Sequence, residues 1–311
     1  MGPKCNLIID SCCDLPFDLV DREGIELLEF PYIMEDGEHS DDLYRSGSAA
    51  AFFQAMRGGV QPSTAQLSIP RIRESFMRVA ESGVPAVYIG FSGELSGSFD
   101  AAQMVHSQIM EEYPKTELYL VDSKLASIAE GMVVYEAIRQ RDRGLTAAEL
   151  AEWATEALCY VNCQFMVDDL ETLRRVGRIP SSVAYAGSKL DVKPLLTIDL
   201  EGKLALVGVA RGRRKGIKQL AAYYEKRAVT TAPGQCVILG HADCPKDVER
   251  LKEALSKSDD NILFLEGSIG PVIGSHVGPG TLAVVFWGPD RRDTISVADM
   301  IARKVKGEDH S

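Results

Sequence analysis

The chain has 311 residues, of which 45% are hydrophobic and 25% are charged. This length and composition exclude a disordered chain and favour two domains, each with its own core. The 34 basic and 45 acidic residues give a formal net charge of −11, which would repel the phosphates of nucleic acids and of anionic bilayers. Nucleic acid is therefore disfavoured as the main partner.

The cysteines and the N-terminus indicate the cellular compartment. The seven cysteines do not show the paired spacing of zinc or redox sites, so we expect reduced thiols and no metal site. No stretch reaches the roughly 20 apolar residues of a membrane span, and residues 1–5 lack the hydrophobic core of a signal peptide. The sequence predicts a cytoplasmic protein without a membrane span.

The first half alternates short apolar strands with amphipathic helices, and the strands are predicted at residues 5–10, 25–33, 84–90 and 118–121. After Gly97, apolar residues recur at three- and four-residue steps, the period of a helix face. Thr146 and Glu149 have the spacing of a capping box at the start of another helix. This alternation predicts a mainly parallel sheet with flanking helices, which binds ligands at the carboxyl ends of its strands. We assign residues 1–160 to this N-terminal α/β domain.

The second half has a different pattern, with strands predicted at residues 203–209, 237–240 and 262–265 and fewer helices between them. One helix is expected to begin at Pro245, where the missing N–H of proline costs little. We assign residues 161–311 to a C-terminal α+β domain.

Hydroxyl side chains are concentrated at the predicted strand ends of the first domain, among them Ser63, Thr64, Ser92 and Ser96, the last followed by Gly97. Each one alone more often caps a helix. As a set, with backbone amides at helix N-termini, they would bind an anionic head group such as a carboxylate. Neither Ser92 nor Ser96 has the glycine pattern of a nucleophile elbow, so a serine hydrolase is only an alternative.

The segment 267–280 contains five glycines and two prolines, and it holds His276. We expect a glycine-rich loop around a buried histidine, which could either be simply packed or hydrogen-bond a carboxylate. Its Gly278–Ala283 part matches a dinucleotide fingerprint by letters alone, because a strand follows where a helix is required. His241 and Cys244 are too few for a convincing metal site.

Arginines mark two further positions. Arg211 opens a basic run before a predicted helix, and cations at a helix N-terminus oppose its dipole. The run is either a solvated surface or a binding site. As a binding site it would take an anion or an acidic partner surface, or it would bind DNA if the protein were a nucleic-acid-binding regulator. Arg178 stands in a predicted turn, where we expect it to pair with a carboxylate.

Several motifs, taken in order, resemble those of the DegV family of lipid-binding proteins, which includes the fatty-acid-binding subunits of bacterial fatty acid kinase. The resemblance covers nearly the whole chain and rests on Ile9-Asp10-Ser11, Asp14-Leu15-Pro16, Ser63-Thr64-Ala65-Gln66, Leu95-Ser96-Gly97-Ser98-Phe99, Val121-Asp122-Ser123-Lys124, Val167-Asp168-Asp169-Leu170, Gly177-Arg178-Ile179, Val192-Lys193-Pro194-Leu195-Leu196 and Gly270-Pro271-Val272-Ile273-Gly274-Ser275-His276.

The resemblance implies a two-domain α/β fold with a long-chain fatty acid in a cleft between the domains. Thr64 and Ser96 match the hydroxyls that hold the carboxylate, and His276 matches the histidine beside it. Arg178 and Arg211 match arginines of the phosphoryl-transfer complex. We expect Ser63, Ser92 and Gly97 to complete the ligand-binding set.

The implied role is to present the acid to an ATP-dependent kinase subunit, which forms an acyl phosphate for phospholipid synthesis. Phosphate transfer needs nucleotide and metal sites, and the sequence shows no pattern for either. We therefore expect a carrier that is not itself an enzyme and has no cofactor other than its ligand. The chain has Ala65, Leu67 and Gly93 where the family often has Ser, Pro and Ser, so a different amphiphile is an alternative ligand. A self-sufficient hydrolase using Ser96 and His276 is another alternative function.

Overall fold

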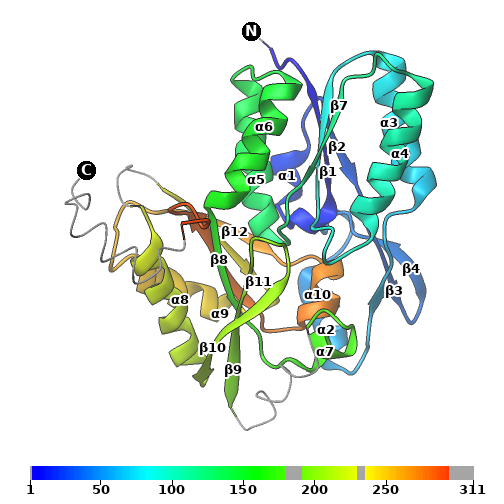
Figure 1. The fold of residues 1–311 in the computed structure, drawn as a ribbon. Helices are drawn as coiled ribbons and strands as arrows, with labels where there is room; N and C mark the ends of the chain where they lie inside the picture. The colour runs from blue at the N-terminus through cyan, green and yellow to red at the C-terminus, as the bar shows by residue number, and fades with distance from the viewer. Residues whose placement is uncertain (1, 180–190, 230–234, 294–311) are drawn as a thin grey trace, which may run out of the picture.

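The computed structural model describes residues 2–179, 191–229 and 235–293. Its helices and strands form a mixed α/β fold with two main sheets, one in the upper part of Figure 1 and one in the lower part. The expected α/β fold, with a mainly parallel sheet and flanking helices in the N-terminal half and further strands and helices in the C-terminal half, is confirmed, and the second sheet is mixed.

The N-terminal sheet is parallel, with the strand order β2-β1-β6-β7. Its strands are β1 (Asn6–Asp10), β2 (Ile25–Leu28), β6 (Ala86–Gly90) and β7 (Leu118–Asp122). Every residue of β6 is buried, as expected for a central parallel strand covered on both faces.

The single strand predicted over residues 25–33 is wrong. After β2 the chain leaves the sheet and forms β3 (Pro31–Met34), which pairs with β4 (Gly37–Ser40) and β5 (Ser63–Thr64) in a small antiparallel sheet. Pro31 has no backbone N–H, and such a residue fits the first position of a strand rather than the middle of one.

Helices cover both faces of the parallel sheet, with α3 and α4 on one side and α5 and α6 on the other (Figure 1). The helices of this half are α1 (Phe17–Val20), α2 (Ala49–Arg57), α3 (Ile69–Ser82), α4 (Ser98–Glu112), α5 (Ile128–Asp142) and α6 (Ala147–Ala157), with short 3-10 turns η1 (Ser11–Cys13) and η2 (Leu158–Tyr160). The capping box predicted at Thr146 and Glu149 is present at the start of α6.

The C-terminal sheet is mixed, with the order β10-β9-β8-β13-β11-β12. Its strands are β8 (Val161–Met166), β9 (Val192–Ile198), β10 (Leu204–Arg211), β11 (Cys236–His241), β12 (Leu263–Ser268) and β13 (Leu282–Trp287). Helices α8 (Arg213–Arg227) and α9 (Pro245–Leu255) pack together beside it. Helix α5 contacts β8, β11 and β13 of this sheet.

The expected glycine-rich loop at residues 267–280 contains a helix, α10 (Pro271–Val277), so the loop prediction is wrong there. Pro271 fits the first turn of a helix. Gly274 faces the rings of Phe52 and Phe53, where a Cβ atom would lie 2.7 Å from Phe53 Cζ. The glycine therefore permits close packing of α10 on α2 rather than marking a turn.

Two hydrophobic cores hold the molecule together. One is continuous from β1 through α5 to β13, and it joins both halves of the chain. The other lies between the C-terminal sheet and helices α8 and α9. The division at residue 160 falls in η2, between α6 and β8, and it stays a prediction.

Candidate functional site

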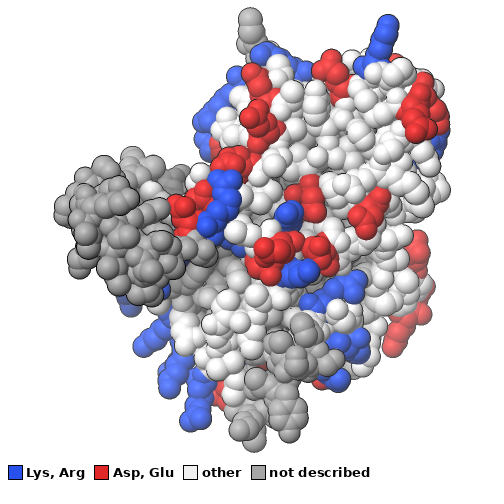
Figure 2. Space-filling view, in the orientation of Figure 1, with Lys and Arg blue, Asp and Glu red and all other residues white. Residues whose placement is uncertain are grey.

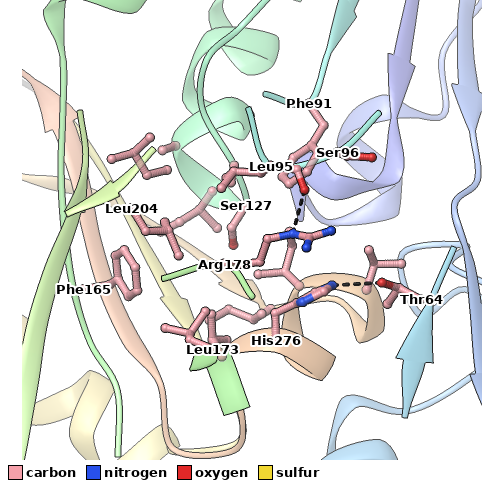
Figure 3. Close-up of a pocket in the computed structure, with 18 of the residues that line it drawn as sticks. Thr64, Phe91, Leu95, Ser96, Ser127, Phe165, Leu173, Arg178, Leu204 and His276 are labelled. Carbon is pink, nitrogen blue, oxygen red and sulfur yellow. Dashed lines mark hydrogen bonds between the residues drawn. The ribbon is translucent and has the colours of Figure 1, made fainter. Parts of the chain in front are cut away.

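A cavity with a volume of about 250 Å³ lies between the two halves of the molecule. Most of its wall is apolar, including Phe165, Ile198 and Leu204 on the C-terminal sheet and Phe91 and Leu95 after β6. Figure 3 shows Phe165 and Leu204 on one side and Thr64 and Ser96 on the other. The cavity thus has an apolar side and a polar side.

Thr64 and His276 meet in the polar part of the wall, with Thr64 Oγ1 2.9 Å from His276 Nε2 (Figure 3). Thr64 lies in β5, where it is paired with Tyr32 of β3, and His276 lies in α10. The sequence predicted both residues for one site, and the fold brings them together across 212 positions of the chain.

His276 is a neutral imidazole in this environment. Burial, and then the nearby positive charge of Arg178, lower the pKa of His276 to about 4. A neutral imidazole has one donor and one acceptor nitrogen. If Nε2 donates to Thr64, the Thr64 hydroxyl proton is free to bind an oxygen atom in the cavity.

Ser96 and Gly97 also line the cavity, just before α4. Ser96 Oγ lies 3.0 Å from Ser98 Oγ and accepts from the Ser98 amide at 3.2 Å. No hydrogen bond joins Ser96 to His276 among the described residues, since His276 Nε2 bonds Thr64 instead. This geometry gives no support to a hydrolase in which His276 activates Ser96.

Arg178 supplies a positive charge to the same region. It follows α7 (Glu171–Arg175), and its Nε donates to the Leu95 carbonyl at 2.8 Å while Nη1 donates to the Val176 carbonyl at 2.8 Å (Figure 3). The expected partner carboxylate is absent from the described part of the chain, so that prediction is wrong there. Arg178 is exposed and its carbonyl partners are neutral, so its charge is available to attract an anion in the cavity.

Three predicted site residues lie away from the cavity lining. Ser63 is exposed. Ser92 is fully buried and donates to the Gly202 carbonyl at 2.9 Å, so it joins the two halves of the chain. Arg211 is exposed at the end of β10. The geometry does not support ligand contact by Ser63 or Ser92.

The sequence suggested that the basic run beside Arg211 binds an anion. For Arg213, a residue of this run, the anionic partners are carboxylates of the protein itself. Arg213 Nε donates to Asp247 at 2.6 Å, and its Nη1 donates to Asp168 at 2.7 Å. Basic side chains project over α8 and β10 at the lower left of Figure 2, while acidic groups are scattered among basic ones elsewhere on that face. This distribution does not favour a nucleic-acid-binding face.

The polar cavity residues that the sequence reasoning missed include Gln66, Thr281 and Ser127, the last of which lies just before α5. It comes five residues after the end of β7, so it did not count among the hydroxyls at strand ends. The motif Val121-Asp122-Ser123-Lys124 next to it was the available signal. Among residues 2–179, 191–229 and 235–293, no group of His, Cys, Asp and Glu side chains could hold a metal ion, and no helix is long and apolar enough to cross a membrane.

The fold and the cavity define a class: an α/β protein with an interior, mostly apolar pocket that is polar on one side. A sequence model of uncharacterised DegV family proteins matches residues 4–288. A DegV domain-containing protein of Clostridium perfringens is 34% identical over 288 residues, which are 92% of this chain and 98% of that protein. One from Streptococcus pyogenes serotype M1 is 31% identical over 287 residues, 92% of this chain and 99% of that protein. The chain therefore belongs to the DegV family.

Solved structures of this family share the fold. A fatty-acid-binding DegV family protein from Thermus thermophilus is 26% identical with a TM-score of 0.79, and the match covers 92% of this chain and 100% of that chain. The fatty acid kinase B3 protein of Streptococcus pneumoniae, loaded with linoleic acid, has a TM-score of 0.79 at 18% identity and covers 93% of this chain and 100% of that chain. At that identity the likeness shows the fold alone.

Proposed function

We propose that this protein binds a long-chain fatty acid in the cavity and presents its carboxylate to an ATP-dependent kinase subunit, which phosphorylates it. The observation that carries the proposal is the division of the cavity into an apolar wall and a polar side with Thr64, Ser96 and His276. The Thermus thermophilus relative binds fatty acid, and the Streptococcus pneumoniae relative is a fatty acid kinase component.

The energetics of binding suit an amphiphile with one acidic end. A buried carboxylate costs several kcal/mol unless hydrogen bonds satisfy it. The hydroxyls of Thr64 and Ser96 are available for this purpose, and Arg178 adds an uncompensated positive charge. Each buried CH₂ of the acyl chain contributes about 0.8 kcal/mol, so a long chain outweighs the cost of ordering the ligand.

The position of the polar side supports presentation to a second protein. Gly97 and Arg178 line the cavity and are both exposed, so a carboxylate beside them lies near the surface. Phosphoryl transfer requires a nucleotide site and bound metal ions. In this proposal the kinase subunit supplies both.

Native mass spectrometry of the purified protein, followed by denaturing extraction and lipid analysis, tests the ligand. We expect a fatty acid at about one molecule per chain, because a buried acyl chain should survive purification. Recovery of another amphiphile would change the ligand class. A protein that is empty and also ignores added oleic acid would overturn the proposal.

Single substitutions test the assigned roles. We expect Thr64→Ala and Ser96→Ala each to weaken oleic acid binding about tenfold, the effect of losing one hydrogen bond to a charged group. Arg211→Ala should leave binding unchanged, because Arg211 lies outside the cavity lining, and should slow phosphorylation by the kinase subunit. Calorimetric titration and a phosphorylation assay with the purified kinase measure these effects. Equal affinity in all three variants would contradict the site.

A further inference from the structure

Ser127 has a backbone conformation that a serine seldom adopts. Its φ of 55° and ψ of −146° fall in a region that is essentially confined to glycine, because a Cβ atom there is crowded by the backbone. A residue other than glycine persists in such a conformation only where the surrounding structure enforces it, and such strain is concentrated at functional sites. Glycine would start helix α5 equally well and without strain. The position before the helix therefore does not explain why a serine stands there.

The Ser127 side chain is placed where a ligand would touch it. Ser127 is half-buried and lines the cavity together with Thr64, Ser96 and His276. Figure 3 shows its hydroxyl pointing into the space between Leu95 and Arg178. A glycine at position 127 would relieve the backbone and remove this hydroxyl from the cavity.

One buried carboxyl group holds the hydroxyl in place. Ser127 Oγ is hydrogen-bonded to Asp14 Oδ2, and Asp14 Oδ1 accepts from the Gly270 amide at 2.9 Å. Asp14 is 2% exposed, and Gly270 is the residue that precedes α10, the helix of His276. Asp14 thus ties together two parts of the cavity wall that are far apart in the chain.

The contacts around Gly270 are too close for a side chain at this position. A Cβ atom at position 270 would lie 2.5 Å from Asp14 Oδ1 and 2.9 Å from Asp41 Oδ2. The Tyr44 hydroxyl donates to the Ile269 carbonyl at 3.1 Å. The start of α10 is therefore hydrogen-bonded to two side chains of the N-terminal half, and of these Asp14 alone also bonds Ser127.

We propose that Ser127 is a further residue that binds the ligand carboxyl group, and that Asp14 is the positioning residue that holds its hydroxyl against the backbone strain. This inference rests on the proposed function, because it places the Ser127 hydroxyl beside the acidic head group. Ser127 Oγ donates its proton to Asp14 Oδ2, so the lone pairs of the Ser127 oxygen remain to accept a hydrogen bond from the protonated carboxyl group of the ligand.

Oleic acid binding to Ser127→Gly tests the first part. The variant relieves the backbone and removes the hydroxyl, so we expect affinity to fall about tenfold while the unfolding temperature stays the same or rises. The matched control is Lys124→Gly, which relieves another positive φ, of 49°, in the same loop without changing the cavity lining. This control should keep wild-type affinity.

Two substitutions of Asp14 test the second part. Asparagine and glycine both tolerate the left-handed conformation of Asp14, with φ 51° and ψ 28°. Asp14→Asn keeps an acceptor for the Gly270 amide and still bonds Ser127, with Nδ2 donating to Ser127 Oγ, so the serine stays in place and affinity should stay within about threefold of wild type. Asp14→Gly releases Ser127 and the start of α10, so affinity should fall at least as far as in Ser127→Gly.

The outcomes separate this inference from the proposed function. A wild-type protein that binds no oleic acid overturns both. Wild-type binding with unchanged affinity in Ser127→Gly overturns the role of Ser127, and so does an equal loss in Lys124→Gly. Equal losses in Asp14→Asn and Asp14→Gly overturn the positioning role, because the asparagine preserves the hydrogen bonds.

Discussion

Four carboxyl groups are buried together beside the cavity, and their burial and mutual repulsion determine which residues can be ionised. Asp10, Asp14, Asp41 and Glu130 are at most 2% exposed. Asp10 accepts from the Phe91 amide at 2.8 Å and the Cys12 amide at 3.0 Å, whereas neither oxygen of Glu130 has a donor among the described groups. Burial, and then the negative charge of Asp10, raise the pKa of Glu130 well above its usual value. Neighbouring carboxylates cannot all be ionised, so some of these groups keep their protons in the folded protein.

Asp41 makes this protonation measurable as a dependence of stability on pH. Burial raises its pKa from 3.8 to about 7, so between these values the folded state binds a proton that the unfolded state has lost. Its contribution to stability is present below pH 3.8 and is lost as pH rises through 7. We expect Asp41→Asn to gain roughly 2 to 4 kcal/mol relative to wild type between pH 4 and pH 8.

Urea unfolding of both proteins at several pH values checks this prediction. Asp18→Asn is the matched control, because Asp18 is exposed and the same substitution there alters no buried group. If wild type and Asp41→Asn keep a constant difference from pH 4 to pH 8, Asp41 does not retain its proton in the folded protein.

At the scale of elements, α10 shows why the glycine-rich segment was wrongly predicted as a loop, although its residue His276 was correctly assigned to the cavity. Its glycines resemble those of a turn, but the decisive contact is with Phe52 and Phe53 of α2, which no local pattern reveals. We expect Gly274→Ala to lower the free energy of unfolding by about 1 to 3 kcal/mol. Both rings are buried and cannot move away from a Cβ atom 2.7 Å from Phe53 Cζ.

Chemical denaturation measures this effect, and Gly208→Ala is the matched control. The nearest atom to a Cβ at position 208 is Leu195 Cδ1 at 3.8 Å, an ordinary contact, so the control should be nearly neutral. Because α10 holds His276, oleic acid affinity should fall in Gly274→Ala as well. Equal stability of the two variants would show that α2 and α10 can separate freely.

Long periodic elements were predictable and short ones were not. Helix α4 and the capping box of α6 follow from local spacing, whereas the two-residue strand β5 exists only because β3 pairs with it. Thr64 and His276 were both predicted from motifs, and their contact depends on this pairing and on α10. The motif at residues 121–124 lies next to Ser127 but does not show its contact with Asp14, because that hydrogen bond joins residues 113 positions apart in the chain.

For the whole molecule, the arrangement of α5 argues for one cooperative unit. This helix is buried on several faces, with Met132, Val133 and Val134 at 0% exposure. It contacts both η1 and α6 on one side and β8, β11 and β13 of the C-terminal sheet on the other. A helix that is apolar around most of its circumference is a core element, and removing either half would expose it.

We therefore expect residues 1–160 and 161–311 to unfold together, although each has its own sheet. Differential scanning calorimetry should give one transition with equal calorimetric and van't Hoff enthalpies. A fatty acid bound between the halves stabilises only the folded state, so oleic acid at 100 times its dissociation constant should add about 2.7 kcal/mol and raise the transition by several degrees. Two transitions, with only one shifted by oleic acid, would instead mean that the continuous core does not couple the halves and that the ligand contacts one of them.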